Sequence, residues 1–229
     1  MRILVVNGAP AGAEAMALLG CVEGDGGALR PVRMRDLPGR GGAEAMPAHC
    51  SALLAECGWR PADLDLIAVV VGPGSFTGLR ATLAMAHGLA LGTGCALVGV
   101  TGGEAMARAL RDEAGPGRAV LCLSPARRGR IFVEQDGVVA AAMCDDFAFP
   151  PGPLLVAGGE AAAMLAARGA GRDDIALSAR TVPDGVMIAQ AALDRRAAGL
   201  PAREILPLYV DPPEAKLPAA GLRPAPRGP

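Results

Sequence analysis

A glycine-rich turn between a strand and a helix is the first place in this sequence where chemistry could be located. The turn, residues 72–80, follows an apolar, β-branched run at 66–71 and precedes a helix that we expect over 77–91. A strand, a tight turn and a helix N-terminus can together present backbone N–H groups to an anion. The turn lacks the Gly-Lys-Ser/Thr of a Walker loop and the Gly-x-Ser-x-Gly of a nucleophile elbow. A helix cap without chemistry, formed by Ser75 or Thr77, and an anion or partner site are both open for it.

The end of the first predicted strand, residues 3–7, is a second candidate, as a phosphate loop. Asn7, Gly8 and Gly12 lie in a stretch whose glycines could wrap a phosphate. Asn7 is neutral and no hydroxyl side chain follows it, so the stretch offers poor ligands for the magnesium of Mg-ATP. We therefore predict only weak nucleotide binding here, if any.

Metal and nucleophilic chemistry have little support in the residue pattern. Neither His49 nor His87 has a second histidine at helical spacing, and the six cysteines form no CxxC pair. The single lysine, Lys216, lies in a proline-rich tail, where it makes a poor partner for a serine nucleophile. Residues 127–130, Arg-Arg-Gly-Arg, are either a solvated hairpin end or a contact for a phosphate backbone or an acidic partner. We predict no catalytic residue and no metal site.

Composition argues against several classes of function. The net charge of −1 provides no electrostatic attraction to nucleic acid or to anionic membranes. Aromatic residues make up 3% of the chain, so stacking platforms for bases are few. No apolar run approaches the roughly 20 residues of a membrane span, and the run after Met1 is too short for a signal peptide. The scattered cysteines suit buried thiols, and we expect a cytoplasmic protein that contacts no membrane.

The helix expected over 77–91 is apolar on nearly all sides. Between Leu79 and Leu91 its polar side chains are only Arg80, Thr82 and His87. A helix that packs on its own sheet with one face normally shows a polar opposite face. Either both faces are buried inside one large domain, or the second face is an interface for another chain.

The order of elements predicts a duplicated α/β architecture. In the first half we expect strands at 3–7, 13–22, 29–34, 66–71 and 96–100, and helices at 43–57, 77–91 and 102–113. Residues 24–27 predict a hairpin turn, 39–42 a flexible break, and Pro47 falls in the first turn of its helix.

The second half repeats this order. We expect strands at 119–123, 130–135, 138–143, 154–156 and 175–177, and helices at 160–168 and 184–198, the last capped by Asp184. Two βββαβα halves are typical of the actin-like ATPase, ribonuclease-H-like fold. We predict lobes at 1–104 and 105–210 and a fraying Pro-rich tail at 211–229.

Residues 72–80, Gly-Pro-Gly-Ser-Phe-Thr-Gly-Leu-Arg, resemble a motif of the TsaB (YeaZ-type) family of tRNA threonylcarbamoyladenosine biosynthesis. Residues 97–101, 126–132 and 207–210 are also similar to stretches of that family. The chain departs from the family at Asn7, where the family carries Asp-Thr. It also departs near Gly42, where the family carries a histidine and this chain does not. Pro125 and Asp211 replace an aspartate and an arginine of the family.

The resemblance implies an actin-like, non-catalytic subunit that pairs with a TsaD-like catalytic subunit and is joined by a TsaE-like ATPase. It implies that this chain alone binds no cofactor, that ATP and a metal belong to the partner subunits, and that tRNA meets this chain only through the complex. It also implies pairing through the helices 43–57 and 77–91. The candidate contact residues are Met46, Leu53, Ser75, Thr77, Arg80, Leu83 and Met85.

Two alternatives come from other classes. One is an actin-like kinase for small molecules or an ATPase, with ATP near residues 7–12. The other is a homodimeric interaction module that uses the same two helices when no partner is present. A glycoprotease activity lacks both a metal and a nucleophile in the sequence.

Overall fold

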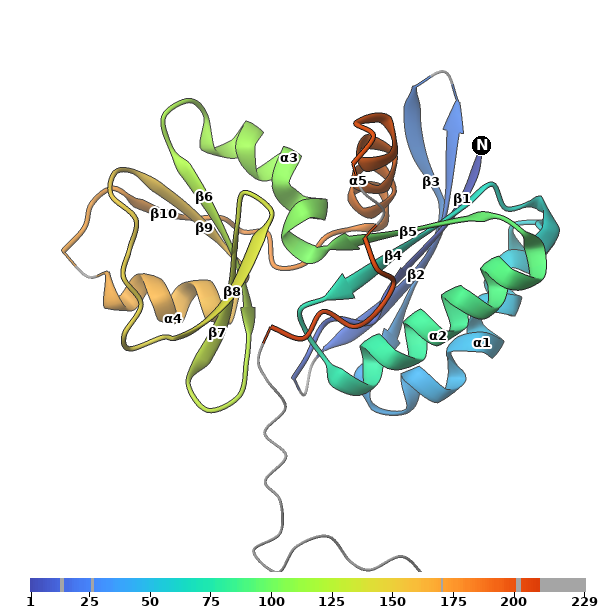
Figure 1. Cartoon of the computed structure of the whole chain (residues 1–229), viewed down its shortest axis with the longest axis horizontal. Coiled ribbons are helices and arrows are strands. Elements are labelled where there is room, and N and C mark those ends of the chain that lie inside the picture. The colour runs from blue at the N-terminus through green and yellow to red at the C-terminus, as the bar shows by residue number, and fades with distance from the viewer. Residues whose placement is uncertain (13–14, 26, 170, 201–202, 211–229) are drawn as a thin grey trace, which may run out of the picture.

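The computed structural model describes residues 1–12, 15–25, 27–169, 171–200 and 203–210. The predicted tail at 211–229, including Asp211, and Gly26 of the predicted hairpin turn lie outside the described residues. Two five-stranded sheets form two lobes, with two helices between them (Figure 1). This is the duplicated actin-like α/β fold that the order of elements predicts.

The first sheet has the strand order β3-β2-β1-β4-β5. The strands are β1 (Arg2–Asn7), β2 (Met16–Asp25), β3 (Ala28–Pro38), β4 (Leu66–Gly72) and β5 (Ala96–Thr101). β1 is antiparallel to β2 and parallel to β4. Every residue of β4 is buried, because helices cover both faces of this part of the sheet. The predicted strands are confirmed in number and order, although β2, predicted over 13–22, begins at Met16 and continues to Asp25, and β3 continues to Pro38. Residues 13–14 of that prediction lie outside the described residues.

Helices α1 (Gly39–Glu56) and α2 (Phe76–Thr93) lie side by side on one face of this sheet (Figure 1). Two predictions about α1 are wrong. Residues 39–42 are not a flexible break but the first turn of the helix, and Pro47 therefore lies in the helix interior. The first turn packs on β3, where Gly42 is buried against the buried Leu37. This packing outweighs the weak helix propensity of glycine.

The second sheet has the strand order β10-β9-β6-β7-β8, the same arrangement as the first. Its strands are β6 (Ala119–Pro125), β7 (Arg130–Gln135), β8 (Val138–Met143), β9 (Leu154–Ala157) and β10 (Ile175–Leu177). The predicted turn between β7 and β8 is confirmed, since Asp136 and Gly137 both have positive φ angles.

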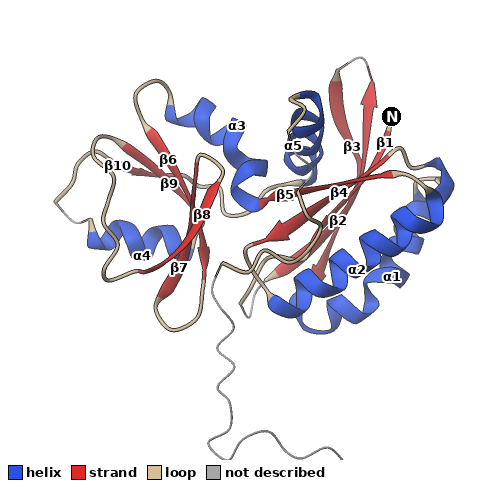
Figure 2. Ribbon diagram, in the orientation of Figure 1, coloured by secondary structure: helices blue, strands red, loops and turns tan. Residues whose placement is uncertain are grey.

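The remaining helices are α3 (Gly102–Ala114), α4 (Glu160–Arg168) and α5 (Gly185–Ala197). α4 covers one face of the second sheet, and α3 packs on β6 and β9 from the other side. α5 follows the second sheet in sequence but packs on the first sheet and on α3 (Figures 1 and 2). The two central helices therefore join the lobes, and each contacts elements from the other half of the chain.

The chain after α5 returns to the first lobe. Residues 203–210, which we call the C-terminal strap, pass beside α2. The Leu208 N–H donates to the carbonyl of Val71 at 2.8 Å, and Nε2 of His87 lies 2.9 Å from the carbonyl oxygen of Ile205. No helix within the described ranges is both long and apolar enough to cross a bilayer.

Candidate partner interface

The glycine turn after β4 packs directly on the end of β1. The Ser75 N–H donates to the carbonyl of Ala9 at 2.8 Å, and the Ser75 hydroxyl accepts from the Gly78 N–H at 3.2 Å. A Cβ on Gly74 would lie 1.9 Å from the Ala9 carbonyl oxygen, and one on Gly78 would lie 2.2 Å from that of Gly8. Ser75 is thus the predicted helix cap, and the glycines of the motif permit two stretches of backbone to touch.

The nucleotide candidates at the end of β1 are engaged with their own backbone. Asn7 is 2% exposed, and its Oδ1 accepts from the Ala9 N–H at 3.0 Å. Gly8 is buried against Gly78, while Gly12 is exposed with φ +121°. The Asn7 side chain therefore holds the turn in shape. Nucleotide binding by these residues stays a prediction.

The predicted contact residues divide into buried and exposed groups. Met46, Leu53 and Leu83 are no more than 2% exposed and point into the core of the first lobe, not away from it. Ser75 and Met85 are half-buried, whereas Thr77 and Arg80 are exposed. The pairing of this chain with a partner through these residues stays a prediction.

Most of the small exposed residues of the helix pair form a different set, none of which was among the predicted contact residues. We call it the outer face: Pro47, Ala48, Ser51, Ala52 and Ala55 of α1, with Ala84, Gly88 and Leu91 of α2. The i, i+4 and i+7 spacing, which places residues on one side of a helix, relates residues 48, 52 and 55 of α1 and residues 84, 88 and 91 of α2. This spacing was the sequence signal that could have identified the face.

None of these eight residues is charged, and the exposed Glu56 of α1 and Arg80 of α2 lie next to the set in sequence. Leu91 is 85% exposed, and a Cβ on Gly88 would meet no atom within 4 Å. Such a surface is poorly suited to water, because the exposed side of a helix is normally polar. An exposed face of apolar and small side chains is suited to close packing against another protein.

Arg80 marks the end of this surface nearest the glycine turn. Its guanidinium carbon lies 3.6 Å from the centroid of the Phe76 ring, and its Nε donates to the hydroxyl of Tyr209 at 2.9 Å. The rings of Phe76 and Tyr209 are 6.0 Å apart, centroid to centroid. Nothing local in the sequence links Tyr209 to Arg80, because the two are separated by 129 positions.

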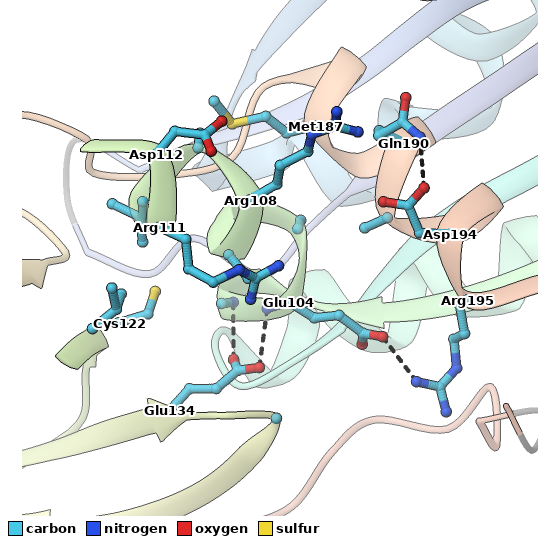
Figure 3. Close-up of a pocket in the computed structure, with 18 of the residues that line it drawn as sticks. Glu104, Arg108, Arg111, Asp112, Cys122, Glu134, Met187, Gln190, Asp194 and Arg195 are labelled. Atoms are coloured by element: carbon cyan, nitrogen blue, oxygen red, sulfur yellow. Dashed lines mark hydrogen bonds and ion pairs between the residues drawn. The ribbon is translucent and has the colours of Figure 1, made fainter. Parts of the chain in front are cut away.

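A separate cavity of about 970 Å³ lies where α3, α5 and the second sheet meet (Figure 3). Glu134 of β7 is buried there and accepts from the N–H groups of Gly103 and Glu104 at 2.8 and 3.0 Å. Burial raises the pKa of Glu134, while these hydrogen bonds and one from the Thr101 hydroxyl act in the opposite direction.

Glu104 continues this polar network into the first lobe. It forms ion pairs with Arg195 of α5 at 2.8 Å and with Arg203 of the strap at 3.1 Å. Burial raises the pKa of the nearby Cys122 thiol to about 12, so this thiol is a poor nucleophile. The network pairs the carboxylates of Glu104 and Glu134 with donors at the joint between the lobes, which favours a structural role.

The other sequence candidates lie apart from the outer face. The basic stretch 127–130 is the predicted hairpin end between β6 and β7, and Pro125 is the last residue of β6. Among the described residues, no group of three or more histidine, cysteine or acidic side chains could hold a metal ion.

Comparisons with known proteins identify the family. A family model described as "TsaD: tRNA N6-adenosine threonylcarbamoyltransferase" matches residues 39–178, well over half of the chain. A tRNA N6-adenosine threonylcarbamoyltransferase of Maricaulis maris is 48% identical over 65 residues, which is 28% of this chain. The match spans only 17% of that transferase.

Two relatives of similar length match over most of the chain. An uncharacterized protein of Mycobacterium bovis is 30% identical, over 77% of this chain and 78% of that protein. The crystal structure of a Pseudomonas aeruginosa protein with similarity to peptidase YEAZ has a TM-score of 0.70 and 21% identity. It covers 92% of this chain and 99% of its own chain. The chain belongs to the TsaD family of the matched model, as a member with the fold of the YeaZ-type (TsaB) proteins.

Proposed function

We propose that this chain is a non-catalytic subunit that docks, through the outer face of α1 and α2, onto a TsaD-like catalytic subunit. The complex would form N6-threonylcarbamoyladenosine in tRNA. The observation that carries the proposal is the outer face itself, which is exposed in the single chain and carries no formal charge. Burying apolar surface is the main favourable contribution to most protein association.

The family supplies the chemistry of the proposal. The matched relatives include a tRNA N6-adenosine threonylcarbamoyltransferase, and we assign that transfer to the partner subunit. ATP and the metal are assigned to the partners, including a TsaE-like ATPase, and tRNA would meet this chain only through the complex. The Asn7 side chain supports this assignment, because it is buried and its Oδ1 accepts a hydrogen bond from the Ala9 N–H.

The test is co-purification with the TsaD-like protein from the same genome, with and without ATP, followed by size exclusion with light scattering. The proposal expects a one-to-one complex that replaces any homodimer. A chain that ignores this partner would contradict it, and a homodimer that persists beside the partner would favour the interaction-module alternative.

A point variant tests whether the outer face is the docking surface. Gly88→Glu puts a charge on the outer face without a clash, because a Cβ there meets nothing within 4 Å. It also replaces glycine with a better helix former, so the single chain should stay folded. We expect weaker docking for Gly88→Glu and unchanged docking for Ala163→Glu, which adds the same charge to an exposed position of α4. If Gly88→Glu and Ala163→Glu bind the partner with the same affinity, the outer face is excluded as the docking surface.

A further inference from the structure

A groove of about 700 Å³ runs between α2 and the C-terminal strap. Its lining is mainly apolar: the almost fully buried Val71 and Leu83 contribute little surface, and the more exposed apolar lining residues include Ala84 of α2 and Ile205, Leu206 and Leu208 of the strap. Leu206 is 60% exposed at its rim. The groove has room for one or two apolar side chains of a bound segment, and Ala84 makes it continuous with the outer face.

Arg80 stands at one end of this groove in a fixed orientation. Phe76 stacks on the guanidinium, and the hydroxyl of Tyr209 holds its Nε. Arg80 is exposed and forms no ion pair within the described part of the chain. Among the described residues, none accepts a hydrogen bond from its Nη1 or Nη2 group, so within this part of the chain these two groups can donate in parallel. Such a preoriented fork matches the two oxygens of a carboxylate.

The surroundings of Arg80 favour a protein ligand over a nucleic acid. Binding to a phosphate backbone uses several cations in a row. Here the other arginine that lines the groove, Arg203, is paired with Glu104, and His87 is engaged with the backbone of the strap. With Arg203 paired, the charged side chains left in the lining are Arg80 and the exposed Glu204, so among the described residues the groove presents one unpaired cation and no row of cations. An arginine beside an apolar groove is suited to an acidic residue that neighbours an apolar one.

We propose that Arg80 and the groove together recognise a segment of a partner protein in which a carboxylate lies next to a large apolar side chain. The apolar side chain enters the groove between α2 and the strap, and the carboxylate accepts two hydrogen bonds from the Nη groups of Arg80. This deepens the proposed function and rests on it for the identity of the partner, the TsaD-like subunit. The chemistry of recognition itself does not depend on that identity.

The first test needs no partner and uses hexanoate, which joins a carboxylate to an apolar chain. The Nε–H signal of Arg80, assigned by its loss in Arg80→Lys, is followed by NMR in the full chain. We expect a saturable shift of this signal and of the Leu208 amide, with about tenfold tighter binding than acetate because acetate cannot fill the groove. Hexanol should leave the Arg80 signal in place.

Three results would overturn the proposal. One is the absence of a saturable shift with hexanoate. Another is a shift of the Arg80 signal by a tRNA anticodon stem-loop but not by hexanoate, which would point to phosphate. The third is a chain that self-associates and loses this self-association in Arg80→Lys, which would make a second copy the occupant.

The second test uses the TsaD-like subunit. Arg80→Lys keeps the charge but loses the fork, and we expect about tenfold weaker binding, whereas Arg196→Lys on the exposed end of α5 should bind as the native chain does. Unchanged binding by Arg80→Lys would overturn the proposal. If the native chain binds hexanoate but not the subunit, the proposed function fails and the recognition site stands.

Discussion

The buried carboxylate of Glu134 accepts a hydrogen bond from the backbone N–H of Gly103 at 2.8 Å. Glu134 belongs to the second sheet, and Gly103 lies in the first turn of α3, directly after the last strand of the first sheet. A carboxylate at a helix N-terminus satisfies free N–H groups and interacts favourably with the helix dipole. This contact therefore fixes one lobe to the helix that leaves the other.

The close contact between Gly103 and Glu134 can be tested with two neighbouring glycine variants, one in the contact and one outside it. A Cβ on Gly103 would lie 2.5 Å from Oε2 of Glu134, whereas one on the neighbouring Gly102 would meet nothing within 4 Å. We expect Gly103→Ala to lower the free energy of unfolding by about 1–3 kcal/mol through overpacking. Gly102→Ala should lower it by much less, as measured by urea unfolding. Equal effects would mean that Glu134 moves aside freely.

Neighbouring residues of α2 separate core from surface. Leu83 is 2% exposed, and Ala84 is exposed. We expect Leu83→Ala to destabilise the chain by about 2–5 kcal/mol through a cavity in the core. Ala84→Glu should change stability by less than about 0.5 kcal/mol. Thermal unfolding of the two variants tests this, and a stable Leu83→Ala chain would contradict the packing described here.

The glycine turn should be intolerant of side chains. Gly74→Ala would place a Cβ 1.9 Å from the carbonyl oxygen of Ala9, at a φ angle of +159°. We expect the free energy of unfolding to fall by about 1–3 kcal/mol or more, because the turn and the end of β1 must move apart to make room for the Cβ. The control is Gly92→Ala on α2, where a Cβ meets no atom within 4 Å. This substitution should raise the free energy of unfolding by about 0.5–1 kcal/mol, because alanine has the higher helix propensity. Refolding yield and urea midpoints decide between these outcomes.

The lowered pKa of Asp63 predicts a contribution to stability that is lost at low pH. Hydrogen bonds from Arg60 lower the pKa of Asp63 from 3.8 to about 2. A carboxyl whose pKa is lower in the folded state contributes stability above its unfolded pKa and loses it as the pH falls through the folded value. We therefore expect Asp63→Asn to remove part of the stability difference between pH 4 and pH 2. Asp112→Asn on α3 is the control, and identical acid profiles would contradict the prediction.

The sequence alone determined the elements and their order. Leu66–Gly72 is a run of apolar residues that only a doubly covered strand accommodates, and the helical period of α4 and α5 gave their bounds to within a residue. Ser75 and Asp184 were identifiable as caps, because a cap is a local hydrogen bond within one turn of helix. The nine-residue motif at 72–80 likewise pointed to the family, which the comparisons confirm.

Only the tertiary structure decided which side of each helix is free. Met46, Leu53 and Leu83 are apolar by sequence and proved to be core, while the exposed outer face consists mainly of small residues that were not among the predicted contacts. The structure also turned residues 39–42 into helix and placed α5 on the first sheet. It brought Tyr209 to Arg80 across 129 positions. Local patterns encode the period and the ends of an element, but the face that is buried and the distant residue that it meets depend on how the elements pack.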